Sequence, residues 1–94
     1  MISIIIPTHN RCDSLHKLLS NIADIEKNIS LEVIVVDNNS TDNTRNIAQR
    51  FKFVNYVFEK NTAFTKAREA GALNASKEIL LFIDDDVLLN ENSI

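Results

Sequence analysis

The chain is poor in the residues that build several common kinds of site. Its 94 residues include one glycine, one proline and one cysteine. With Gly71 as its only glycine, the chain lacks both the G-x-G-x-x-G pattern and the P-loop, so both glycine-rich phosphate-binding loops are excluded. With Cys12 as its only cysteine, it can form no internal disulfide, which fits a reducing compartment.

Positive charge and long apolar segments are also scarce. The formal net charge is −3, and the chain shows none of the basic patches typical of nucleic-acid binding, so we expect no nucleic-acid partner. The N-terminal residues contain no cationic segment followed by a long apolar run. We therefore predict neither a signal peptide nor a membrane span, and expect a cytoplasmic protein.

The chain does contain apolar runs that alternate with segments whose apolar residues recur at helical spacing. The composition, 45% apolar and 24% charged, is typical of one small globular domain. Four runs predict strands, over residues 2–6, 31–36, 53–58 and 79–83. Between them lie three predicted helices, whose N-caps we assign to Asp13 or Ser14, Ser40 or Thr41, and Asn61 or Thr62. This order predicts an α/β fold, a parallel sheet of about four strands with helices on both faces.

The boundaries and inner faces of these elements follow from local chemistry. Pro7 is expected to stop the first strand because it lacks a backbone N–H, and the first helix to end near Asn28. Gly71 costs the third helix about 1 kcal/mol, which predicts that this helix approaches the sheet closely. The side chains expected on the inner helix faces are Leu15, Leu18, Leu19, Ile22 and Ile25, then Ile47, Ala48 and Phe51, then Ala63, Ala67, Ala70, Gly71 and Asn74.

The last predicted strand is an unbroken apolar run, which is typical of a strand buried on both faces. Three aspartates, residues 84–86, follow it directly. In an extended chain Asp84 and Asp86 would project to the same side, about 6.6 Å apart. At that distance two carboxylates repel each other by about 2–3 kcal/mol. A hard divalent cation with oxygen ligands would remove this repulsion. A solvated acidic turn remains the alternative.

Polar residues follow two other predicted strands as well, at 8–11 and 37–42. Taken singly, each set has a plain structural interpretation as loop or turn residues. The C-terminal ends of parallel strands lie along one edge of a sheet, which is where open α/β sheets bind ligands. The three sets together therefore predict a binding site at this edge.

Four segments carry a resemblance to a known family. They are IIIPTHNR at 4–11, VVDNNSTDNT at 35–44, AREAG at 67–71 and FIDDD at 82–86. In order and spacing they resemble the N-terminal half of the family 2 nucleotide-sugar glycosyltransferases. The resemblance implies a partial glycosyltransferase A-type, Rossmann-like fold with strand order third, second, first, fourth. Asn39 stands at a customary glycine and can adopt the left-handed conformation of that turn.

The resemblance also implies roles for the residues of the first two loops. Pro7, Thr8 and Asn10 would line the nucleoside pocket. His9 would pack on the base, and Asp37 would accept a hydrogen bond from a ring N–H of the base.

The resemblance assigns the remaining site residues to the sugar diphosphate and to a metal. Arg68 would approach the diphosphate or the ribose. The aspartates resemble a D-x-D motif, in which Asp84 and Asp85 would contact the ribose and the donor sugar. Asp86, with Asp84, would ligate Mn²⁺ or Mg²⁺. This agrees with the charge, because a diphosphate beside three carboxylates needs a cation between them.

By the same resemblance, residues 1–94 would be a single donor-binding half that lacks the acceptor-binding half. The donor would be a UDP-, GDP- or dTDP-sugar, and the acceptor a saccharide or lipid-linked molecule of cell-envelope polysaccharide synthesis. The full-length protein would act at the inner face of the membrane. The general base of an inverting transfer would lie beyond residue 94, so no catalytic residue is expected in this chain. Its fourth strand would be an uncovered edge that favours self-association.

Two other function classes also place carboxylates at strand ends. A nucleotidyltransferase-like enzyme uses an acidic metal site, but its triphosphate loop is usually basic or glycine-rich, and the first loop here offers only Arg11. A receiver-like signalling domain needs a phosphorylatable aspartate after a middle strand and a lysine after a later one.

Overall fold

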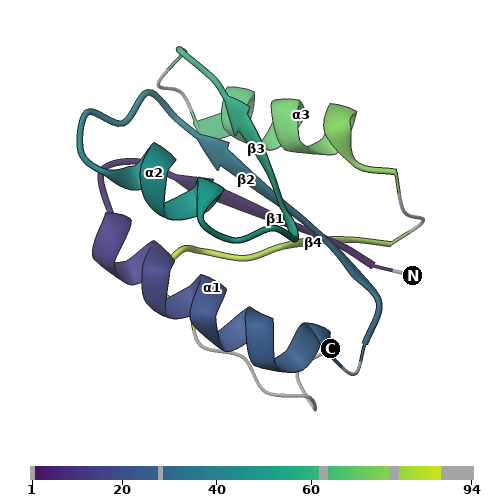
Figure 1. The fold of residues 1–94 in the computed structure, drawn as a ribbon. Helices are drawn as coiled ribbons and strands as arrows, with labels where there is room; N and C mark the ends of the chain where they lie inside the picture. Colours follow the sequence, from purple (N-terminus) through teal and green to yellow (C-terminus); the bar gives the residue numbers. More distant parts are fainter. Residues whose placement is uncertain (1, 28, 62–63, 77–78, 88–94) are drawn as a thin grey trace.

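The computed structural model describes residues 2–27, 29–61, 64–76 and 79–87 as strands and helices that alternate along the chain. The elements are β1 (Ile2–Thr8), α1 (Cys12–Glu26), β2 (Leu31–Asp37), α2 (Thr44–Gln49), β3 (Val54–Phe58), α3 (Phe64–Asn74) and β4 (Ile79–Phe82). The four strands form one parallel sheet in the order β3-β2-β1-β4 (Figure 1). The predicted fold class and strand order are therefore confirmed.

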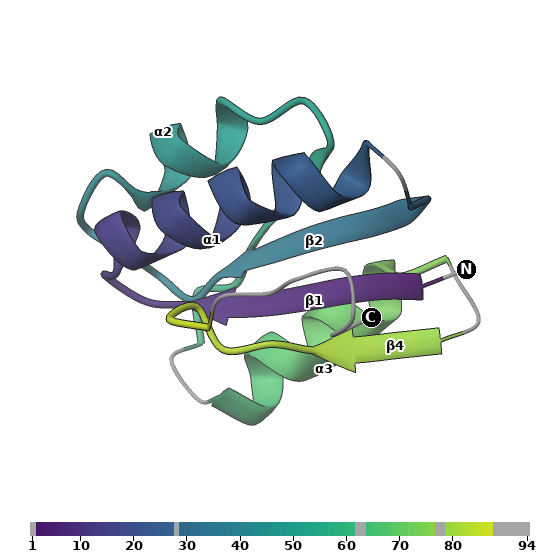
Figure 2. The ribbon, with the colours of Figure 1, turned by 90° about the horizontal axis from the view of Figure 1, so that it is seen from below.

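The two inner strands are covered on both faces. Seen from below, α1 and α2 lie on one side of the sheet and α3 on the other (Figure 2). Alternate side chains of β1 and β2 point to opposite faces, so each strand supplies both layers of the core. The fully buried apolar side chains of these two strands are Ile4, Ile5, Ile6, Val33, Ile34, Val35 and Val36. Of the described helices, none is long and apolar enough to cross a bilayer.

Gly71 brings α3 into close contact with the sheet, as predicted. A Cβ atom at this position would lie 2.3 Å from Cγ2 of Ile5 and 3.2 Å from Cγ2 of Val36. Ala67, one turn earlier, is completely buried on the same face. The helix rests on β1 and β2 through side chains no larger than a methyl group.

The prediction that Pro7 stops the first strand is wrong, since β1 continues to Thr8. Alternate residues of β1 direct their backbone groups to opposite neighbours. The carbonyl of Ile5 accepts from the N–H of Ile83 on the β4 side, and the carbonyl of Thr8 accepts from Asn38 on the β2 side. Pro7 therefore faces β4, beyond the last β1–β4 pair, and its missing N–H removes no hydrogen bond from the ladder.

The predicted N-caps of the first helix are corrected. The helix begins at Cys12, one residue before Asp13, and Arg11 occupies the N-cap position without a side-chain capping bond. The carboxylate of Asp42 supplies the missing acceptor, because its Oδ2 accepts from the Cys12 N–H at 3.2 Å. The loop after β2 thus caps the helix that follows β1.

The second helix begins at Thr44, later than the predicted N-caps Ser40 and Thr41. Asn43 holds the N-cap position, and Oδ1 of Asp42 accepts from the Thr44 N–H at 3.0 Å. One aspartate therefore serves the starts of both α1 and α2.

One predicted helix end, one predicted N-cap and one predicted inner-face residue lie outside the described residues: Asn28, Thr62 and Ala63. The last residue of α1 is Glu26, and the first of α3 is Phe64. The inner-face position predicted for Asn74 is wrong, because this residue is exposed and its Nδ2 donates to the carbonyl of Ala70 at 2.8 Å.

The fourth strand is an edge, and the prediction of burial on both faces is wrong for it. Ile79 is 56% exposed, Leu80 40% and Phe82 38%. Within the described residues β4 pairs only with β1, and α3 is packed over β1 and β2. Ile83, just past the strand, is buried at 6% exposure and continues the pairing through its N–H to Ile5.

Candidate functional site

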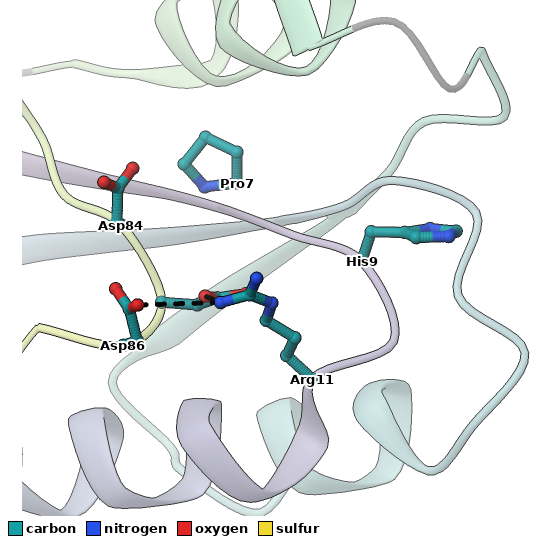
Figure 3. A pocket seen from close by; sticks show the side chains of 6 residues that line it. Pro7, His9, Arg11, Asp84 and Asp86 are labelled. Carbon is teal, nitrogen blue, oxygen red and sulfur yellow. Dashed lines mark ion pairs between the residues drawn. The ribbon is translucent and has the colours of Figure 1, made fainter.

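A cavity of about 380 Å³ lies at the C-terminal ends of β1 and β4. These strands are neighbours in a parallel sheet, so the loop after each one emerges at the same edge. The residues lining the cavity are Pro7, His9, Arg11, Asp84, Asp85 and Asp86 (Figure 3). The structure thus brings five of the predicted site residues together and adds Arg11.

The middle aspartate of the triplet points inward and anchors its loop. Asp85 is 7% exposed, and its Oδ2 accepts from the hydroxyl of Thr8 at 2.8 Å. Burial raises the pKa of the Asp85 carboxyl, while the Thr8 hydrogen bond and the nearby Arg11 oppose the rise. Thr8 itself is 2% exposed, so its hydroxyl holds the acidic loop and does not line the cavity.

Asp84 and Asp86 are the exposed members of the triplet, and both line the cavity. The chain turns here, since the N–H of Val87 donates to the carbonyl of Asp84 at 3.3 Å. In Figure 3 the carboxylates of Asp84 and Asp86 stand apart along the loop.

Arg11 is the cation of this site. Its Nη1 lies 3.5 Å from Oδ1 of Asp85 and 3.6 Å from Oδ2 of Asp86. The side chain extends from the start of α1 toward the triplet (Figure 3) and is 57% exposed. Sequence reasoning assigned it no role; the available signal was that it is the sole cation of a loop at the ligand-binding edge.

His9 and Asn10 tie the first loop to the second. Nδ1 of His9 donates to the carbonyl of Asn38 at 2.6 Å, and the ring lines the cavity. Asn10 adopts a left-handed φ of 51°, and its Oδ1 accepts from the N–H groups of Thr41 and Asp42 at 2.7 and 3.2 Å. Asn10 therefore shapes the loop and does not line the cavity.

Asp37 closes β2 in a buried turn. It is 2% exposed; Oδ1 accepts from the N–H of Ser40 at 2.9 Å, and Oδ2 from the hydroxyl of Tyr56 at 2.6 Å. Burial, reinforced by this carboxylate, raises the pKa of the Tyr56 phenol. Asn39 has a φ of 60°, which confirms the left-handed turn. Asp37 lies beside Thr8 in the ladder but outside the residues that line the cavity.

Arg68 is another predicted site residue that does not line the cavity. It lies on α3, across the sheet from α1, and its guanidinium covers the ring of Phe82 at 5.4 Å from the centroid. This position is near the end of β4 but outside the cavity lining.

The carboxylates fit a metal ion whose remaining ligands come from water or from a bound phosphate. Among the described residues, no group of three or more His, Cys, Asp or Glu side chains could by itself hold a metal ion. Mg²⁺ and similar ions are often bound by one or two carboxylates, with phosphate oxygens and water as further ligands. Asp84 and Asp86, exposed at the cavity, are donors of that kind.

Comparison with known proteins gives one consistent family. The sequence pattern of "Glycosyl transferase family 2" matches residues 3–94. The chain is 34% identical to validoxylamine A glucosyltransferase of Streptomyces hygroscopicus subsp. jinggangensis over 94% of this chain and 22% of that protein. These matches do not support the nucleotidyltransferase and receiver alternatives.

Two solved structures show the same fold. TarS 1-349 of S. aureus in complex with UDP has a TM-score of 0.85 at 26% identity, covering 96% of this chain and 28% of that one. The mannosyltransferase PcManGT of Pyrobaculum calidifontis, in complex with GDP-Man and Mn²⁺, has a TM-score of 0.81 at 28% identity over 98% and 29%. The chain spans about a quarter of the length of these relatives. With a family match over nearly its whole length and this strand order, the chain belongs to glycosyl transferase family 2.

Proposed function

We propose that this chain is the donor-binding part of a glycosyltransferase and binds a nucleoside-diphosphate sugar together with Mn²⁺ or Mg²⁺. One observation carries the proposal: three consecutive carboxylates line a cavity at the C-terminal ends of β1 and β4. Support comes from two similar structures, one in complex with UDP and the other with GDP-Man and Mn²⁺. We expect the donor to be a UDP-, GDP- or dTDP-sugar.

The proposed roles follow from exposure. Asp86 and Asp84 would hold the metal, because they are the exposed carboxylates at the cavity. The metal, when bound, would neutralise charge on the departing nucleoside diphosphate. Asp85 would position the loop through Thr8, while its other oxygen lies beside Arg11.

The base would lie against the first loop. His9 offers a ring whose orientation is set by its hydrogen bond to Asn38, and Pro7 forms the adjacent wall. Asn10 and Asp37 hold the two loops that frame this region. Asp37 is buried, and its carboxylate oxygens already accept from Ser40 and Tyr56. It would accept a hydrogen bond from the base only if the turn at Ser40 opened. Arg68 would reach the diphosphate only by leaving the ring of Phe82.

The acceptor and the catalytic base belong to the proposal only by resemblance. We infer an inverting transfer whose general base lies beyond residue 94, to a saccharide or lipid-linked acceptor of the cell envelope at the inner face of the membrane. The isolated chain would then bind a donor without completing transfer.

Calorimetric titration of UDP and GDP, each with Mn²⁺ and with EDTA, tests the donor site. We expect binding of at least one nucleotide that requires the metal, because the carboxylates repel an uncompensated diphosphate. Failure of both nucleotides to bind at millimolar concentration with Mn²⁺ would contradict the proposed function.

We also propose that the chain self-associates through β4. Its apolar side chains Ile79, Leu80 and Phe82 are exposed at the sheet edge, and an exposed apolar edge strand favours pairing with a second copy. Sedimentation should show a concentration-dependent dimer that Leu80→Lys shifts to monomer. The control Leu73→Lys changes an apolar residue of α3 that is 79% exposed, away from the edge, and should leave the dimer intact. A wild-type monomer at millimolar concentration would refute the pairing.

A further inference from the structure

Arg11 lies beside the carboxylates that we propose as metal ligands. Its guanidinium pairs with both Asp85 and Asp86, at 3.5 and 3.6 Å. Arg11 and these carboxylates line the same cavity (Figure 3). A guanidinium and a divalent cation are both drawn to the same carboxylate oxygens, and each weakens the attraction for the other.

A capping or purely structural role does not account for this side chain. Arg11 stands at the N-cap position of α1 but makes no side-chain capping bond. Its backbone is held, because its carbonyl accepts from the N–H of Leu15 at 2.9 Å. The backbone is therefore anchored at the helix start while the charged end extends over the acidic loop.

Of the two ion pairs, the one between Arg11 and Asp86 is of the kind that a metal can displace, whereas the Asp85 side chain is only 9% exposed. Charge-assisted N–H···O bonds are usually about 2.7–2.9 Å long, and both Arg11 contacts are longer. The Arg11 side chain is 57% exposed and that of Asp86 59% exposed. Exposed pairs of this sort contribute little, at most a few-fold in an equilibrium constant.

We propose that Arg11 is a built-in counter-ion of the acidic triplet, which the divalent cation displaces from Asp86, and that the released guanidinium then binds the diphosphate of the donor. The inference rests on the proposed function and adds a residue to it. Before the metal binds, Arg11 offsets part of the repulsion among the carboxylates. After it binds, a positive side chain already at the cavity faces the anionic ligand.

The proposal predicts opposite effects of one substitution on two ligands. Arg11→Gln removes the competitor, so Mn²⁺ alone should bind about two- to fivefold tighter. The same variant lacks a charged donor to the phosphates, so UDP or GDP in saturating Mn²⁺ should bind about tenfold more weakly. Arg11→Lys keeps the charge but loses the planar fork, and should lie between wild type and Arg11→Gln in both measurements.

Electron paramagnetic resonance of free Mn²⁺ measures the first effect without nucleotide, and calorimetry measures the second. Arg50→Gln is the matched control: it removes the same charge from an exposed residue at the end of α2, outside the cavity lining. This control should change neither constant by more than about twofold.

Two results would overturn the counter-ion role. One is that Arg11→Gln binds Mn²⁺ no tighter than wild type, or not measurably. The other is that tighter Mn²⁺ binding appears equally in Arg50→Gln, which would make it an effect of net charge. Failure of the donor proposal is a separate result, because it requires that wild type bind neither nucleotide in Mn²⁺, whatever the nucleotide-free titration shows.

Discussion

Gly71→Ala is expected to lower the free energy of unfolding by about 2 kcal/mol, which is about 10 °C in the melting temperature of a domain of this size. The new Cβ would stand 2.3 Å from Cγ2 of Ile5. Alanine gains about 1 kcal/mol in helix propensity, but overpacking a core costs up to about 3 kcal/mol. The overpacking term should prevail because Ile5 and Val36 are fully buried and β-branched, with little freedom at χ1.

Chemical denaturation with two further variants isolates the cause. Leu73→Ala alters α3 at a side chain that is 79% exposed and should stay within about 0.5 kcal/mol of wild type. Ile5→Leu keeps the volume of the side chain but has no methyl group at the γ2 position. Combined with Gly71→Ala, it should recover about 1 kcal/mol relative to the sum of the single changes. A Gly71→Ala protein as stable as wild type would show that α3 can move away from the sheet at little cost.

The inner strands and Gly71 could be predicted because their causes are local. Residues 31–36 are apolar except for Glu32, and β2 covers them. The close approach at Gly71 followed from the cost of glycine inside a helix. The strand order came from the family resemblance, since alternation alone leaves several orders of a parallel sheet open.

Two of the errors have long-range causes. The start of α1 depends on Asp42, whose Oδ2 accepts from the N–H of Cys12, 30 residues earlier in the chain, and no local capping rule includes such a partner. The exposure of β4 reflects where α3 sits, over β1 and β2.

The candidate site, too, could be predicted only where its causes are local or follow from topology. Its place at the strand ends follows from parallel topology, so the triplet and the first loop were found in the sequence. Which aspartate turns inward was not, because it depends on the hydroxyl of Thr8, 77 residues earlier in the chain. Arg11 was missed for the same reason: its partners come from the other end of the sequence.

Asp86→Asn is expected to weaken Mn²⁺-dependent binding of UDP or GDP by about 100-fold. Loss of a residue that only supports a metal ligand often costs about 10–100-fold, and loss of a charged ligand should cost at least as much. Asparagine keeps the size of the side chain but removes the charge that attracts the cation. Calorimetry at fixed Mn²⁺ measures the loss, and Asp84→Asn should change the affinity in the same direction.

The fold should not change in this variant. The Asp86 side chain is 59% exposed, so its unfolding free energy should stay within about 0.5 kcal/mol of wild type. Asp24→Asn is the control, with the same chemical change near the end of α1 at a side chain that is 82% exposed; it should leave nucleotide affinity as in wild type. Equal nucleotide affinity in Asp86→Asn and Asp24→Asn would remove Asp86 from the proposed metal ligands.

Combining the two changes joins this prediction to the role proposed for Arg11. In wild type the guanidinium and the metal compete for the Asp86 carboxylate, so removal of Arg11 should tighten Mn²⁺ binding. In the Asp86→Asn background that shared carboxylate is gone, and Arg11 retains only Asp85. Arg11→Gln should then change Mn²⁺ binding by less than twofold, a non-additivity expected when two residues act on one ion. Full additivity would mean that Arg11 and Asp86 act on the cation independently, as part of the general charge of the surface.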